Sequence, residues 1–192
     1  MEYPWYDDVN DSVLLEQGDI IEECFVLVPS AEHYQDIISG QNTGNNELPI
    51  QEINGIVMSQ SCDIVQSKID SIILCSIWSL EYLIKNKSHF KSSKATEELR
   101  QGKYPAYHLL NIFETDTMPR DFYFVDFHSI YSVPKTFLEA TLSGKTRKRL
   151  LPPYREHLSQ SFARYFMRVG LPIDIEKEKI KEKFDEHSSS FK

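Results

Sequence analysis

The stretch DFYFVDFHSIY, residues 121–131, decides how the fold of this chain is interpreted. Aromatic residues and valine dominate it, and these residue types are enriched in β-strands. Pro134 ends the stretch and starts a short helical segment, PKTFLEATL, with proline at a tolerated first-turn position. We therefore predict a strand over residues 121–131, followed directly by a helix.

Four other segments have strand character, and they lie on the N-terminal side of residues 121–131. They are DIIEECFVLVP (19–29), PIQEINGIVMSQS (49–61), DSIILCSIWS (70–79) and YPAYHLLNIF (104–113). Between the last two, residues 80–102 change to a helical period, and residues 152–170 place apolar side chains on one helical face. This order predicts an α+β fold: a small bent antiparallel sheet or an SH3-like barrel, with a helical insert and a C-terminal packing helix.

The length of 192 residues indicates one domain. We expect it to span residues 1–173, with an irregular acidic arm over 1–17, a helical insert over 79–103 and a charged helical tail over 174–192. No run approaches the roughly 18 apolar residues of a membrane-spanning helix, and the N-terminus has no apolar signal segment. Three cysteines without CxxC spacing indicate reduced thiols. We expect a cytoplasmic protein that does not contact a membrane and, without a GxGxxG or GxxxxGK[ST] motif, carries no cofactor.

Charge is distributed unevenly along the chain. Residues 1–23 hold eight acidic side chains and no Lys or Arg, whereas residues 145–168 hold seven Lys or Arg and one Glu. One interpretation is that the two segments neutralise each other in the fold. The other is that the basic segment binds an anionic ligand. The binding candidates are Arg147, Arg149, Arg155, Arg164 and Arg168.

The stretch VMSQSCDIV, residues 57–65, places a thiol beside a carboxylate at the end of a predicted strand. Cys62 could be a nucleophile with His108 or His128 as its base. The charge of Asp63 works against this role, because a neighbouring carboxylate raises the pKa of a thiol. The favoured alternative is that Cys62 is a small buried residue at the strand end and that Asp63 bonds backbone amides of the turn.

A second set of polar residues is a weak candidate for a metal site. Asp126 and His128 are two apart in a predicted strand and share a face, so with His108 they could form a two-histidine, one-carboxylate site. The alternative is a buried Asp–His hydrogen bond, or a bond from Asp126 to an arginine of the last helix. We hypothesise that Asp63 and Asp126 pair with arginines of the helix over 152–170.

Two families resemble this sequence. The segments SQSCDI, HLL (108–110), VDF (125–127) and RLLPPYREHLSQSFARYFMRVGLP (149–172) resemble a bacterial protein family of unassigned activity. This resemblance covers most of the chain and implies a bacterial cytosolic origin.

The order of segments also resembles the MazF/PemK-like toxins, SH3-type barrels that cleave RNA. Gly18-Asp19-Ile20, residues 55–59, residues 72–76 with Ser79, residues 124–126 and the helix from Pro152 correspond in order to their elements. The family's catalytic arginine is replaced here by Ile53-Asn54, and residues 1–67 contain no Lys or Arg. Metal-free RNA cleavage requires a cation near the scissile phosphate, so the resemblance implies the fold without the activity.

We therefore expect a non-catalytic binding or regulatory module of a bacterial toxin–antitoxin or phage-defence system. It would contact nucleic acid or a partner enzyme through residues 145–168, and a protein partner is expected. The alternative is an enzyme, either a degenerate MazF-like endoribonuclease using Arg155, Arg164 and Ser79, or a thiol enzyme using Cys62. An enzyme should show a concave pocket where Cys62, Asp63, His108 and Asp126 converge.

Overall fold

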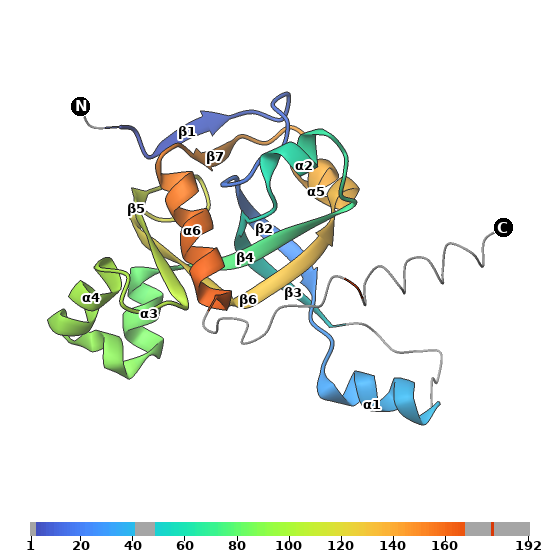
Figure 1. Ribbon diagram of the computed structural model, residues 1–192, viewed down its shortest axis with the longest axis horizontal. Helices are drawn as coiled ribbons and strands as arrows, with labels where there is room; N and C mark the ends of the chain where they lie inside the picture. Colours follow the sequence, from blue (N-terminus) through green and yellow to red (C-terminus); the bar gives the residue numbers. More distant parts are fainter. Residues whose placement is uncertain (1–2, 41–48, 168–177, 179–192) are drawn as a thin grey trace.

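The computed structural model describes residues 3–40, 49–167 and 178. These residues form a five-stranded antiparallel sheet, a two-stranded antiparallel sheet and six α-helices (Figure 1). The predicted α+β class is confirmed. Most of the expected tail over 174–192, together with Arg168, lies outside the described residues.

The strand predicted from DFYFVDFHSIY organises the main sheet. It is β6 (Asp121–Pro134), which pairs with β4 (Ser71–Ser79) on one side and with β5 (Tyr107–Phe113) on the other. The sheet continues through β3 (Ile50–Val57) to β2 (Ile20–Leu27), giving the order β2-β3-β4-β6-β5. In the described part of the chain β2 and β5 remain edge strands. Of the two predicted forms, the structure therefore has the bent sheet and no closed barrel.

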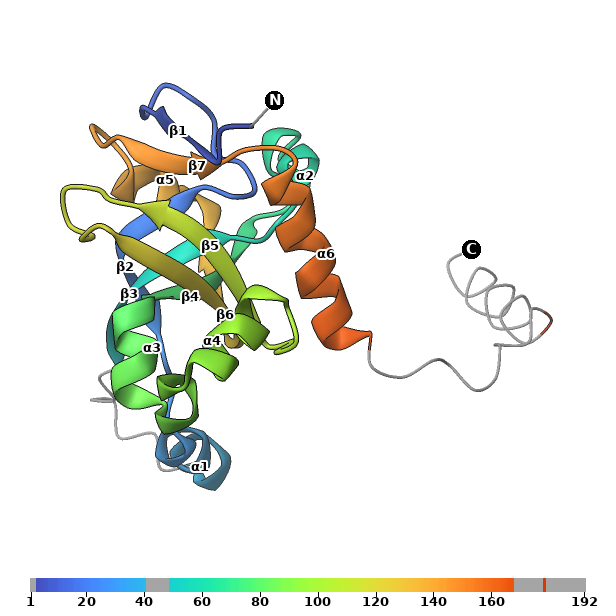
Figure 2. The ribbon, with the colours of Figure 1, turned by 90° about the vertical axis from the view of Figure 1, so that its left-hand side faces the viewer.

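A second, two-stranded sheet pairs a strand near the N-terminus with the strand that precedes the last helix. β1 (Tyr6–Val9) runs antiparallel to β7 (Arg147–Leu150), with Tyr6 opposite Leu150 and Val9 opposite Arg147. It lies over one end of the main sheet (Figure 2). The prediction of an irregular arm over residues 1–17 is therefore wrong for residues 6–9. The acidic residues of β1 lie opposite the basic residues of β7, and opposite charges on paired positions stabilise a strand pair.

The helices are short and lie between or after the strands. They are α1 (Ala31–Ser39), α2 (Ser61–Val65), α3 (Leu80–Asn86), the 3-10 helix η1 (Ser88–Lys91), α4 (Ser93–Arg100), α5 (Lys135–Thr141) and α6 (Tyr154–Phe166). Ser92 caps α4 by accepting a hydrogen bond from the Ala95 backbone N–H. α3, η1 and α4 lie together at one end of the sheet, whereas α1 extends away from the ends of β2 and β3 (Figures 1 and 2).

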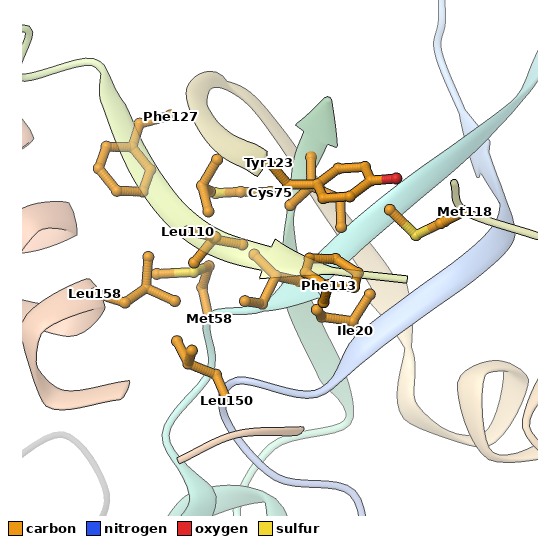
Figure 3. Close-up of a cluster of buried hydrophobic side chains, with 13 residues drawn as sticks. Ile20, Met58, Cys75, Leu110, Phe113, Met118, Tyr123, Phe127, Leu150 and Leu158 are labelled. Carbon is orange, nitrogen blue, oxygen red and sulfur yellow. The ribbon is translucent and has the colours of Figure 1, made fainter. Parts of the chain in front are cut away.

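Three apolar clusters hold these elements together. The largest lies between the main sheet, β7 and α6, where Leu110, Phe127, Leu150 and Leu158 point toward one another (Figure 3). A second packs α5 against the opposite face of the sheet, and a third lies beneath the helices α3, η1 and α4. Leu158 is the fully buried residue of α6 and fixes that helix against the sheet.

Candidate functional site

Two arginines of the basic segment form a buried ionic cluster with Asp19. Asp19 is fully buried, and Arg147 and Arg149 of β7 are almost fully buried. Arg147 Nε donates to Asp19 Oδ2 at 2.8 Å, and Arg149 Nη2 donates to the same oxygen at 2.9 Å. A buried carboxylate that receives two guanidinium groups is compensated, whereas either charge alone would be costly at this depth.

The remaining donors of both arginines bind the N-terminal segment. Arg147 Nη2 donates to the Val13 carbonyl oxygen at 2.7 Å, and Arg149 Nη2 donates to the Leu14 carbonyl oxygen at 2.6 Å. Arg149 Nη1 also pairs with Glu16 at 3.0 Å. The acidic and basic segments therefore neutralise each other here, as the first interpretation of the charge pattern predicts. These two guanidinium groups are occupied within the chain.

The arginines of α6 lie in a different environment. Arg155 is partly buried and pairs with Glu16 at 3.3 Å and with Glu156 at 3.2 Å. Arg164 is exposed and, within the part of the chain that the structure describes, makes no ion pair. Of the binding candidates with described positions, Arg164 is thus the one whose charge is most available to a ligand.

Arg164 borders a groove between α6 and the segment that runs from α4 into β5. The groove has a volume of about 640 Å³. Arg100, Tyr104 and Tyr107 line one side, and His157, Ser161 and Arg164 of α6 line the other. Among the described residues that line it there is no aspartate or glutamate. Arg100 is paired with Glu97 at 2.6 Å, so Arg164 is the arginine of this lining without a carboxylate partner among the described residues, and such a lining favours anions.

His108 lies at the base of this groove and is 7% exposed. Burial, and then the nearby His157, lower the pKa of His108 to about 3, so its ring is neutral near pH 7. Ser161 Oγ donates to the His157 carbonyl oxygen at 2.9 Å and lies 3.1 Å from His108 Nδ1. Since the hydroxyl proton is used on the carbonyl, His108 Nδ1 is the donor to Ser161 Oγ. The contact joins β5 to α6 and does not activate the serine.

The prediction that Cys62 is packed in the core is wrong. Residues 61–65 form the helical turn α2, in which Ile64 is the buried residue and Cys62 is exposed. The Cys62 thiol lies 3.6 Å from Asp63 Oδ1. The neighbouring serines take up the polar role expected at the strand end. Ser59 Oγ accepts from the Ile73 backbone N–H, and Ser61 Oγ accepts from that of Gln17.

The two carboxylates that we expected to anchor the last helix have other partners. Asp63 lies 3.9 Å from Lys68 Nζ, and Asp126 bonds His128 Nδ1 at 2.9 Å. Neither contacts Arg155 or Arg164 within the described residues, so the hypothesis is wrong for these two arginines. The alternative of a hydrogen bond between Asp126 and His128 is confirmed, but the bond is exposed and not buried as predicted.

The three candidate metal ligands do not lie on one face. The register of β5 and β6 sets Tyr107 opposite Asp126 and His108 opposite Val125. Paired residues share a face and successive residues alternate, so His108 and Asp126 point to opposite sides of the sheet. In residues 3–40 and 49–167, no three His, Cys, Asp or Glu side chains come close enough to hold a metal ion.

The remaining catalytic candidates are also separated. Ser79 Oγ accepts the Tyr82 backbone N–H at 3.1 Å and caps α3. A second cavity of about 680 Å³ lies between β2, residues 114–117 and residues 141–148, with both acidic and basic side chains in its lining. Neither this cavity nor the groove is lined by Cys62, Asp63, Ser79 or Asp126.

Three groove residues escaped the sequence analysis: Arg100, Tyr104 and Tyr107. Arg100 ends α4 within the helical insert, and Tyr104 and Tyr107 lie in the segment predicted as a strand, so their local patterns indicate secondary structure and not a groove. The helical spacing of His157, Ser161 and Arg164 is the signal that was present. No protein-family model, curated protein or solved structure matches this chain. Among the described helices none has both the length and the apolar character required to cross a membrane.

Proposed function

We propose that this protein is a non-catalytic binding or regulatory module that holds single-stranded RNA in the groove between α6 and β5. The observation that carries the proposal is the composition of the groove: cationic side chains on two sides and no carboxylate among its described lining residues. The whole chain has a net charge of −8, so this lining departs from the character of the molecule. Polyanions bind through such local cationic surfaces.

The groove residues suit phosphates and bases. Arg164 offers a guanidinium group for a backbone phosphate, and Arg100 stands across the groove with its charge shared with Glu97 at 2.6 Å. Tyr104 packs edge-on against Phe90 and donates its hydroxyl to Glu98 at 3.1 Å, so its half-buried ring is held in the groove lining, where an unpaired base could stack on it. Tyr107 packs edge-on against Phe90 and Phe124, so we assign it to the wall of the groove and not to base stacking.

A binding role accounts for the chemistry of the groove better than a catalytic one. His108 has a pKa of about 3 because it is buried, and a base with this pKa takes up a proton poorly near pH 7. The exposed Cys62 lines neither cavity. These features support a module that binds its ligand without cleaving it.

The setting we propose is a bacterial cytoplasmic toxin–antitoxin or phage-defence system with a protein partner. Its support is the resemblance of the segment order to MazF/PemK-like toxins, combined with Ile53-Asn54 in place of their catalytic arginine. A resemblance in segment order does not determine function, so RNA binding is tested directly.

The test measures binding of a 5′-labelled, mixed-sequence single-stranded RNA by fluorescence anisotropy, with the RNA examined on a denaturing gel afterwards. We expect intact RNA, affinity that falls as salt rises, and a loss of about fivefold in Arg164→Gln, since one phosphate contact contributes roughly 1 kcal/mol. The matched control is Arg120→Gln, which removes the same charge from an exposed loop residue outside the groove lining.

Three results would contradict the proposal. Cleaved RNA would support the enzyme alternative. Equal losses in the Arg164 and Arg120 variants would show that binding follows overall charge and not the groove. An affinity that does not change with salt would exclude phosphate recognition.

A further inference from the structure

Helix α1 carries an apolar stripe that faces no part of the described chain. Tyr34, Ile37 and Ile38 are spaced three and four residues apart, and Ile38 is 85% exposed. Glu32 and Asp36 lie on the opposite side of the helix, by the same spacing rule. None of the residues of α1 is buried, so its amphipathic pattern has no core to face.

The ends of β2 and β3, from which α1 extends, carry further exposed apolar side chains (Figure 1). Phe25 and Leu27 alternate with the buried Cys24 and Val26, so they point to the outer face of the sheet and are more than half exposed. Ile50 pairs with Leu27 across the strands and is 65% exposed. We call the six residues Phe25, Leu27, Tyr34, Ile37, Ile38 and Ile50 the arm surface.

The physics of short helices indicates that the arm surface is normally covered. A nine-residue helix is marginal in water by itself, because few hydrogen bonds offset the cost of nucleation. Ser30 and Gly40 cap its two ends, which stabilises the helix but buries no apolar area. Contiguous exposed apolar side chains of this kind mark interaction sites.

The charge of the surrounding segment indicates which kind of partner covers the arm surface. Residues 20–52 contain Glu22, Glu23, Glu32, Asp36, Glu47 and Glu52, and no Lys or Arg. Glu52 lies opposite Phe25 in the strand register. We therefore expect a partner with apolar side chains that cover the stripe and with Lys or Arg residues beside them.

Two other occupants fit this charge poorly. A second copy of this chain that docked through the same arm surface would place these carboxylates next to its own identical carboxylates. The C-terminal residues 174–192 hold five lysines against six acidic residues, so they bring no net positive charge.

We propose that the arm surface is a docking site for a basic amphipathic helix of a partner protein. The apolar face of that helix packs on Ile37 and Ile38, and the negative charge of residues 20–52 attracts its Lys or Arg residues. The site is separate from the groove that borders α6, so it holds whether or not that groove binds RNA. One surface would attach the module to a protein while the other remains open.

The experiment uses the full chain and two synthetic peptides of equal length. One peptide is a helix of Leu and Lys with Leu at three- and four-residue spacing, and its acidic twin has Glu in place of each Lys. The protein variants are Ile38→Glu on the apolar stripe and Gln35→Glu on the polar side of α1. Both add one negative charge to exposed positions of the same helix, so they separate apolar contact from charge.

We expect the basic peptide to bind the parent chain and to slow amide exchange over residues 31–39. Ile38→Glu should weaken binding about tenfold or more, because it removes a buried apolar contact and leaves a charge in its place. Gln35→Glu should leave the affinity unchanged or slightly improved. Circular dichroism checks that both variants retain the parent fold.

Several outcomes would overturn the proposal. The acidic twin could bind as tightly as the basic peptide, or both variants could weaken binding equally. Self-association that Ile38→Glu abolishes would assign the surface to a second copy of this chain. Binding of anionic lipid vesicles through Ile38, with no binding of the basic peptide, would assign it to a membrane.

Discussion

The two halves of the basic segment, β7 and α6, are neighbours in sequence, but their arginines differ in burial and in pairing. On β7, Arg147 and Arg149 are 3% and 7% exposed and surround Asp19. On α6, Arg164 is exposed and borders the groove. The charge pattern of the sequence does not distinguish these three arginines. Their use differs because β7 is paired with the acidic N-terminal strand, whereas the exposed side of α6 faces solvent.

The way each element is held explains the difference. β7 is held by its strand pairing with β1 and by the ionic cluster, so its cations are structural. α6 is held from beneath by Leu158, which leaves its polar side free for a ligand. Basic residues on an element anchored by apolar contacts are therefore better candidates for binding than those on an element anchored by their own charges.

The largest expected effect is on the β7 side. Asp19→Asn removes the carboxylate that two buried guanidinium groups share and leaves Glu16 as the partner of Arg149 alone, so the free energy of unfolding should fall by about 3–5 kcal/mol. Chemical denaturation measures this change. The control is Asp8→Asn, which removes a 2.8 Å pair with Lys148, but the Asp8 side chain is 61% exposed and the loss should stay below about 1 kcal/mol. Equal losses in the two variants would contradict a structural role for the buried cluster.

A smaller effect is expected from His108, where β5 meets α6. The pKa of its imidazole is about 3 in the folded chain and 6.5 without the protein environment, so below pH 6.5 the unfolded chain binds the extra proton. The contribution of neutral His108 to the free energy of unfolding is therefore fully present above pH 6.5, and it is lost progressively as the pH drops toward 3. Between pH 7 and pH 5 the loss from this group is roughly 2 kcal/mol.

The variant His108→Gln should remove this part of the pH dependence of the unfolding free energy. The exposed His89→Gln serves as control and should keep the pH profile of the parent. An unchanged profile in His108→Gln would mean that His108 is not held neutral by its burial between β5 and α6.

The smallest effect is expected at Arg164. Arg164→Gln should change the free energy of unfolding by less than about 0.5 kcal/mol, since an exposed side chain without an ion pair contributes little. Arg149→Gln should cost several kcal/mol, because it leaves Asp19 and Glu16 with fewer partners in a buried site. Thermal or denaturant unfolding of the two variants compares the halves of the basic segment directly. Similar losses of unfolding free energy would contradict the distinction between the structural arginines of β7 and the exposed arginine of α6.

The strands of the main sheet were predictable because their local composition agrees with their tertiary role. β6, β4 and β3 are rich in aromatic and β-branched residues, and each occurs where its pattern predicts. β1 and β7 were not predictable in this way. Their sequences, YDDV and RKRL, have no alternating apolar pattern, and pairing across 140 residues of chain makes them strands.

The candidate site shows the same division. His157, Ser161 and Arg164 stand out in the sequence by helical spacing, and they line the groove. Cys62 and Asp63 stand out more strongly, yet the backbone closes a helical turn there and exposes the thiol. The groove needs residues from both the α4–β5 segment and α6, which are far apart in the chain, so no local pattern could assemble it.

The sequence by itself determined the α+β class, the central strand, the short helices after it and the opposite charges of the two ends. Each of these depends on residue type and spacing within about 15 residues, which act on the backbone locally. Only the tertiary structure decided which charged side chains are paired inside the fold and which remain exposed. Burial of Asp19 between Arg147 and Arg149, and exposure of Arg164, follow from which strands pair and which helix face meets the core. The free energy of a charge depends on its solvation and its partners, and both are set by contacts between distant parts of the chain.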